Sequence, residues 1–84
     1  MDSITILGLI GGSFTTASFL PQVFKTWKTR SAKDVSSGMF VLLSVGITFW
    51  IAYGLKIGSV PIITANSISL VLTFAMLVMK LLYK

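Results

Sequence analysis

Three uncharged, apolar segments of about 20 residues each constrain most strongly what this chain can fold into. They cover residues 4–24, 35–55 and 59–79, and none contains Asp, Glu, Lys or Arg. At about 1.5 Å per residue, a helix of this length crosses the roughly 30 Å hydrocarbon core of a bilayer. Lipid offers no partners to backbone polar groups, so each segment is predicted to be a transmembrane helix.

The composition agrees with a membrane protein. Of the 84 residues, 55% are hydrophobic and only 11% are charged, whereas about a quarter of the residues in soluble domains are charged. A soluble domain this short would bury little apolar surface. The sequence therefore predicts an all-α membrane protein, with residues 1–84 forming a single three-helix transmembrane unit.

The first segment is interpreted as a retained helix rather than a cleaved signal peptide. The chain begins Met1-Asp2-Ser3 and has no basic residue before Lys25. A signal peptide has a basic start and a shorter apolar region. We therefore expect all three helices in the mature protein.

The ionisable residues argue against an enzyme. The chain has no His and no Cys, and its two acidic residues, Asp2 and Asp34, lie outside the apolar segments. General acid–base catalysis, nucleophilic catalysis and metal binding draw on these residue types in sheltered sites. We predict no catalytic residue, no metal site and no cofactor.

The basic residues predict the orientation in the membrane. With three spans, the first loop and the C-terminus share one side, and Lys56 alone lies on the other. The positive-inside rule then places the N-terminus outside and the C-terminus in the cytoplasm of a multi-pass inner (plasma) membrane protein. We interpret the net charge of +5 as topology and lipid contact, not as a nucleic-acid surface. The residues on the basic side are Lys25, Lys28, Arg30, Lys33, Lys80 and Lys84.

The connections between the segments differ in length. Residues 25–34 are predicted to be a basic loop, with Asp34 starting the second helix near its positive dipole end. A very short turn at residues 56–59 leads to the third helix, where Pro61 occupies an early position that tolerates its missing N–H.

Pro21 and Gln22 lie near the end of the first segment. Pro21 removes a backbone hydrogen bond and clashes with the Ala17 carbonyl, so a kink is predicted there. Whether the pair is a static bend or a hinge is left open by these residues alone. In the same helix, the spacing of Gly8 and Gly12 predicts close packing against another helix.

Two further positions are candidates for solute binding. Trp50 lies in the outer half of the second helix, with Gly46 one turn away leaving space beside the indole, although an interfacial Trp is the ordinary alternative. Asn66 lies deep in the third helix, where an unpaired amide is costly. Ser69 and Thr73 extend a polar stripe from it, so binding and interhelical hydrogen bonding are both open.

Taken together, these features resemble the bacterial SemiSWEET proteins, the half-size relatives of SWEET sugar transporters in the PQ-loop group. The resemblance rests on three spans, a Pro-Gln pair closing the first helix, a basic loop, and on Trp50 and Asn66 at these places. It extends over essentially the whole chain.

The resemblance implies a role for each matching residue. Trp50 and Asn66, with Gly46 beside them, would bind sugar, and Pro21 with Gln22 would form the hinge. The bulky side chains of Phe19 and Met39 would close an inner gate. Some relatives pair Arg with Asp at the outer gate, whereas this chain has only Tyr53 and Lys56 there, with no acid nearby.

The resemblance also implies assembly and activity. Three helices cannot enclose a solute path, but a parallel homodimer of six helices can. We expect facilitative uniport of a small sugar, a mono- or disaccharide, by alternating access. Two alternatives remain: a PQ-loop carrier of another small solute such as an amino acid, and a membrane adaptor or assembly protein that transports nothing.

Overall fold

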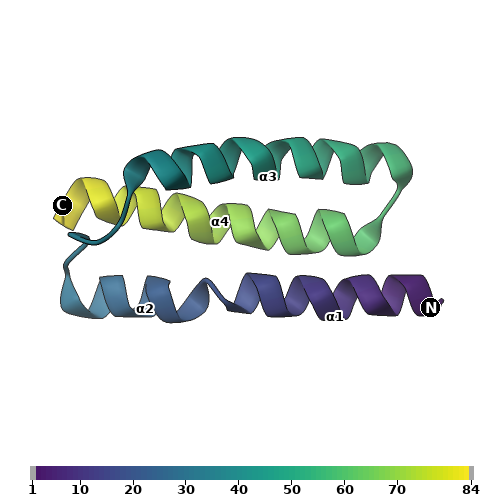
Figure 1. Ribbon diagram of the computed structural model, residues 1–84, viewed down its shortest axis with the longest axis horizontal. Helices are drawn as coiled ribbons and strands as arrows, with labels where there is room; N and C mark the ends of the chain where they lie inside the picture. The colour runs from purple at the N-terminus through teal and green to yellow at the C-terminus, as the bar shows by residue number, and fades with distance from the viewer. Residues whose placement is uncertain (1, 84) are drawn as a thin grey trace.

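The computed structural model describes residues 2–83, which form four helices (Figure 1). Lys84, one of the basic residues used to predict the topology, lies outside the described residues. The helices are α1 (Ser3–Ala17), α2 (Leu20–Thr29), α3 (Ser37–Ile57) and α4 (Val60–Tyr83). Three segments are long and apolar enough to cross a membrane, because α1 and α2 together form one of them, Ser3–Thr29. The three-span, all-α prediction is confirmed.

The first span is interrupted just before Pro21. Helix α1 ends at Ala17, and the N–H of Phe19 donates to the carbonyl of Thr16 at 3.1 Å, one residue closer than in an α-helix. Pro21 has no N–H to offer the Ala17 carbonyl, so the regular hydrogen-bond ladder fails at this point. The predicted kink is therefore present as a break at Ser18 and Phe19, which we call the helix break.

Beyond the helix break, α2 runs further than predicted. It reaches Thr29, so Lys25 and Lys28 are helical, and the prediction of a loop over residues 25–34 is wrong in its first half. Hydropathy marks where lipid contact ends, whereas the helix continues because Lys is a good helix former. Arg30 ends it in the left-handed region, with φ of 53°.

The loop to α3 is held by a short set of hydrogen bonds. The carbonyl of Ala32 accepts from the N–H of Val35 at 3.1 Å and from Lys80 Nζ at 2.8 Å. Ser36 caps α3, accepting from the N–H of Met39 at 3.2 Å. The prediction that Asp34 starts this helix is wrong, because a Ser hydroxyl caps as well as a carboxylate and stands next to the first helical residue.

A tight turn joins α3 to α4. Gly58 adopts φ of 68°, which a residue with a side chain rarely adopts, and the N–H of Ser59 returns to the carbonyl of Gly54 at 2.9 Å. Pro61 follows as the second residue of α4, where its missing N–H costs nothing. As a result, α3 and α4 form a closely connected antiparallel hairpin.

The helices lie nearly in one layer, with α4 between the other two spans (Figure 1). The Cα atoms extend 43 × 21 × 13 Å, so the bundle is flattened, with a thickness well below its width. The 43 Å length matches a bilayer with its headgroups, about 40–45 Å. We call the end with residues 30–36 the loop end and the end with Gly58 the hairpin end.

Two contacts bring the spans together. Near the hairpin end, a Cβ added to Gly8 would lie 2.9 Å from the Cβ of Pro61, and one added to Gly12 would lie 2.7 Å from the Cβ of Ala65. These glycines therefore allow α1 to approach α4 closely, as their spacing predicts. At the loop end a cluster of buried apolar side chains forms the core. Its members are Ala32, Val35, Phe40, Met76 and Met79.

Candidate functional site

An open groove runs along α4 between α1 and α3, because those two helices contact α4 without closing over it. Its wider part has a volume of about 660 Å³, and a narrower part toward the hairpin end adds about 380 Å³. We call the two parts together the central groove. The residues that line both parts are Thr15, Trp50, Asn66 and Ser69.

Trp50 forms the α3 wall of the central groove. Its side chain is 54% exposed and stands edge-on to Tyr53, with ring centroids 5.5 Å apart and an interplanar angle of 89°. A Cβ on Gly46 would meet no atom within 4 Å, so the space predicted beside the indole is present. Trp50 therefore presents a flat apolar surface next to an unfilled hollow, which suits the apolar face of a small ring.

Asn66 faces the central groove from α4. Its Nδ2 donates to the carbonyl of Ile62 at 2.9 Å, which fixes the direction of the amide. Within residues 2–83, its Oδ1 has no hydrogen-bond partner, and it is not a buried atom left unpaired. The amide therefore offers an oriented acceptor to a ligand with hydroxyl groups.

The other members of the polar stripe on α4 do something different. Ser69 is buried and its Oγ lies 3.1 Å from Oγ1 of Thr16 in α1, which also donates to the carbonyl of Ala65 at 3.2 Å. Thr73 is completely buried and donates to the carbonyl of Ser69 at 2.7 Å. Their hydroxyls are used within the bundle, so Asn66 alone remains open to a solute.

Phe19 and Met39 lie where the groove meets the loop end, and both line its wider part. Phe19 is half-buried against the core cluster, whereas Met39 is 52% exposed. The structure thus brings together the two bulky residues predicted to close an inner gate, one from beside the helix break and one from the first turn of α3.

The remaining predicted residues lie outside the central groove. Pro21 and Gln22 are exposed in the first turn of α2, directly after the helix break. Lys56 is exposed in the last turn of α3, and Tyr53 borders a neighbouring hollow of about 380 Å³ that it shares with Gly46 and Trp50.

Comparison with known proteins places this geometry in a family. The PQ loop repeat family matches residues 4–63. The sugar transporter SemiSWEET of Bradyrhizobium diazoefficiens is 41% identical over 80 residues, covering 95% of this chain and 93% of the relative. The SemiSWEET of Escherichia coli is 37% identical over 81 residues, covering 96% and 91%.

Solved structures match this chain over nearly its whole length. A crystal structure of a bacterial homologue of SWEET transporters matches with a TM-score of 0.95 and 44% identity, covering 99% of this chain and 100% of the other. The chain belongs to the SemiSWEET family. A SemiSWEET structure in the inward-open conformation matches with a TM-score of 0.87 and 37% identity, covering 96% and 87%.

One part of this SemiSWEET groove was not predicted from the sequence. Thr15 forms the α1 wall opposite Trp50, and Ser18 lines the groove beside the helix break. The Thr15 hydroxyl bonds back to the carbonyls of Gly11 and Gly12 at 3.2 and 3.1 Å. A hydroxyl with such local partners gives no sequence signal of its own. Its register with Gly8, seven residues earlier on the same helical face, was the available clue.

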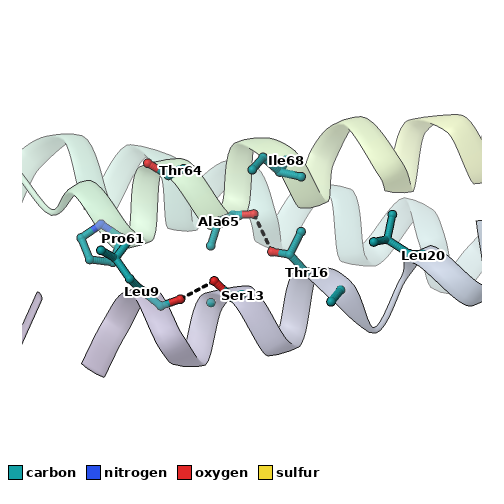
Figure 2. Close-up of a pocket in the computed structure, with 10 residues that line it drawn as sticks. Leu9, Ser13, Thr16, Leu20, Pro61, Thr64, Ala65 and Ile68 are labelled. Atoms are coloured by element: carbon teal, nitrogen blue, oxygen red, sulfur yellow. Dashed lines mark hydrogen bonds between the residues drawn. The ribbon is translucent and has the colours of Figure 1, made fainter. Parts of the chain in front are cut away.

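A second groove of about 270 Å³ lies on the other flank of the α1–α4 contact (Figure 2). Leu9, Ser13, Thr64 and Ile68 line it, and Figure 2 shows the hydrogen bond from Thr16 to Ala65 crossing between the two helices. It contains neither Trp50 nor Asn66. The two grooves therefore differ in chemistry, and the central groove is the candidate site.

Proposed function

We propose that two copies of this chain form a parallel homodimer that carries a small sugar, a mono- or disaccharide, across the membrane by facilitated diffusion. The observation that supports it most is the convergence of Trp50 and Asn66 on one open groove. An aromatic face beside an oriented amide suits a sugar ring, which has an apolar face and a rim of hydroxyls. The relatives are named sugar transporters rather than enzymes.

A second copy is needed because one protomer forms an open wall. The bundle is nearly one layer of helices, so the groove has no cover within the chain. Two such walls, related by an axis along the membrane normal, would enclose a path with a Trp and an Asn from each side. The same charge asymmetry orients both copies alike, with the N-terminus outside the inner (plasma) membrane and the C-terminus in the cytoplasm.

Transport without ion coupling follows from the charges. The chain has two acidic residues and no His, and both acids precede the helices they adjoin. Proton-coupled carriers use a carboxylate or His at membrane depth. We therefore expect sugar flux to be indifferent to a pH gradient and to membrane potential, and stimulation by either would contradict uniport.

Alternating access requires part of the bundle to bend, and the helix break supplies a place. The regular hydrogen-bond ladder is interrupted from Phe19 to Pro21, so α2 could move relative to α1 at a smaller cost in backbone hydrogen bonds than elsewhere in the span. Phe19 lies at the break and also lines the groove. We propose that bending at the helix break opens and closes the loop end, with Phe19 and Met39 as the inner gate. Tyr53 and Lys56 would form the outer gate.

The function is tested by sugar uptake into proteoliposomes. The Trp50→Ala variant should fold normally, because the indole is half exposed, yet lose most of its uptake. A Val71→Ala variant, which changes an exposed residue outside both grooves, is the matched control. Equal uptake by both variants would contradict a sugar site at Trp50 and favour a different solute or an adaptor role.

The dimer is tested by cross-linking, for which the absence of Cys in the chain is convenient. A Cys at Met39, on the groove side, should be joined to its copy by a short bis-maleimide in bilayers. A Cys at Val71, about 140° from Asn66 on the helical wheel of α4, should not. Transport by a protein that remains monomeric in bilayers would overturn the proposal.

The hinge is tested with Pro21→Ala. Restoring the N–H should close the ladder across the helix break, stiffen the first span and slow transport while sugar binding persists. Binding, melting temperature and flux are measured on the same purified variant. Normal flux per folded dimer would show that the break is a static bend.

A further inference from the structure

The outer face of α2 has a composition unlike the rest of the bundle. Helix α2 packs on α4 through its other face, where Val23 is half-buried against the core cluster and Thr26 is buried. The outer face carries two aromatic rings and two ammonium groups within five consecutive positions, all of them exposed. We call this surface the α2 face. Its members are Phe24, Lys25, Trp27 and Lys28.

The aromatic rings of the α2 face lie side by side and point away from the protein. Phe24 and Trp27 are 58% and 56% exposed, with ring centroids 6.3 Å apart. The Lys28 Nζ lies 5.5 Å from the centroid of Phe24, so a cation and an apolar ring share one patch. Rings of this kind favour the boundary between hydrocarbon and headgroups.

Two of the neighbouring cations make contacts at the loop end of the bundle. Lys80 Nζ donates to the carbonyl of Ala32, and the Arg30 guanidinium lies 5.8 Å from the Tyr83 ring. Lys25 and Lys28 instead project from the exposed side of α2. The nearest acid in the sequence is Asp34, the only acidic residue after Asp2, so the basic charge here is largely uncompensated.

The expected depth of the α2 face in the membrane indicates which ligand it contacts. The face occupies the last two turns of the span Ser3–Thr29, and the 43 Å bundle is as long as a bilayer with its headgroups, about 40–45 Å. We therefore expect this face at the headgroup boundary, where the long side chains of Lys25 and Lys28 can reach the phosphates and the rings can lie against the upper acyl chains. Free phosphate would engage the lysines alone, whereas one anionic phospholipid would engage the lysines through its headgroup and the rings through its acyl chains.

We infer that the α2 face is a binding surface for anionic phospholipids, with Lys25 and Lys28 on the headgroup and Phe24 and Trp27 against the start of the acyl chains. Basic groups beside a span attract anionic lipid and are weakened by salt. The inference concerns lipid contact, so it stands whether or not the chain transports sugar.

The test uses Trp27 as a local reporter of which lipid lies beside it. The chain has two Trp residues, so a Trp50→Phe background leaves Trp27 as the sole indole, which can be excited selectively over the two Tyr residues. The protein is reconstituted in mixed phosphatidylcholine and phosphatidylglycerol bilayers, and the bromines that quench the indole are placed on the chains of one lipid or the other. We expect phosphatidylglycerol to be enriched about threefold around Trp27, and the enrichment to fall at high salt.

Lys→Gln substitutions at two places distinguish lipid binding at the α2 face from a general effect of the protein's positive charge. Lys25→Gln with Lys28→Gln should abolish the enrichment, whereas Lys56→Gln, at the hairpin end, should leave it unchanged. Equal quenching by the two brominated lipids in the parent protein would overturn the inference and favour an acidic protein partner for this face. Enrichment that survives the double substitution, or that Lys56→Gln also removes, would overturn it as well.

Discussion

Phe40 and Trp50 lie ten residues apart on α3, in two regions of the molecule with opposite packing. Phe40 is 1% exposed, enclosed at the loop end by side chains from α4 and the loop, whereas Trp50 is 54% exposed on the wall of the central groove. The loop end is completed by the chain itself, and the groove is left incomplete. Large apolar side chains thus serve the fold in one region and remain available for a solute or a second copy in the other.

The largest expected effect is a loss of stability when a large side chain is removed from the loop end but not from the groove. Phe40→Ala should lower the free energy of unfolding by about 3 kcal/mol, the low end for such a change, because lipid already solvates apolar groups and mainly the cavity cost remains. Trp50→Ala should leave the melting temperature almost unchanged. Thermal unfolding in one detergent compares them, and equal losses would mean that the groove wall is part of the core.

Two glycine substitutions test the same difference between packed and open regions, with a smaller expected effect on stability. Gly12→Ala should destabilise the bundle by about 2 kcal/mol, because the new Cβ would lie 2.7 Å from the Cβ of Ala65, which cannot rotate away. Gly46→Ala meets no atom within 4 Å, so it should fold normally and instead hinder sugar binding by filling the hollow beside Trp50. Melting temperature and sugar binding are measured on both, and a normal melting temperature for Gly12→Ala would contradict the close α1–α4 contact.

The polar residues of α4 give the next smaller effect. Asn66→Leu should weaken transport about fivefold for each sugar hydrogen bond lost, at roughly 1 kcal/mol per bond, with the dimer intact. Thr73→Val, which removes a hydroxyl used only inside the bundle, should lower stability slightly and leave flux per folded dimer unchanged. Loss of the dimer in Asn66→Leu would show that Asn66 joins helices instead.

The smallest effect is expected at the N-terminal cap, outside both regions. Hydrogen bonds from Thr5, from its side chain and then its backbone N–H, lower the pKa of the Asp2 carboxyl below its ordinary 3.8. The cap is therefore at full strength above that value and is lost as the pH falls through the lowered pKa. Relative to the intrinsic exchange rate at each pH, the protection of the amides in the first turn of α1 should fall in acid, and in Asp2→Ala it should already be low at neutral pH. In Asp2→Asn, which keeps an acceptor, the protection should show no such step with pH.

The sequence predicts the spans well because lipid imposes a simple rule on them. A helix in hydrocarbon needs about 20 apolar residues, and each of the three segments supplies them. The ends of the helices follow other physics, and there the predictions were less accurate. Lys25 and Lys28 belong to α2 rather than to a loop, and Ser36 rather than Asp34 caps α3.

The candidate site was predictable where a residue is unusual for its surroundings. A Trp beside a Gly and an amide deep in an apolar helix are such signals, and the structure brings Trp50, Gly46 and Asn66 to one groove. The polar stripe on α4 looked uniform in sequence, yet Ser69 and Thr73 are used for packing. Thr15 was missed because which hydroxyl faces the groove depends on how α1 is rotated against α4, and periodicity alone does not specify that contact.

If the first span bends at the helix break, as proposed above, α2 would act as a lever. Helix α2 has 10 residues and is about 15 Å long, so a rotation of roughly 10° at Ser18 and Phe19 would carry its far end along an arc of about 2.5 Å. In this proposal the α3–α4 hairpin, joined by the tight turn at Gly58, would be the fixed frame. Two protomers moving symmetrically apart would double the displacement to about 5 Å. A small angular change near the middle of the membrane is thus amplified into an opening at its surface.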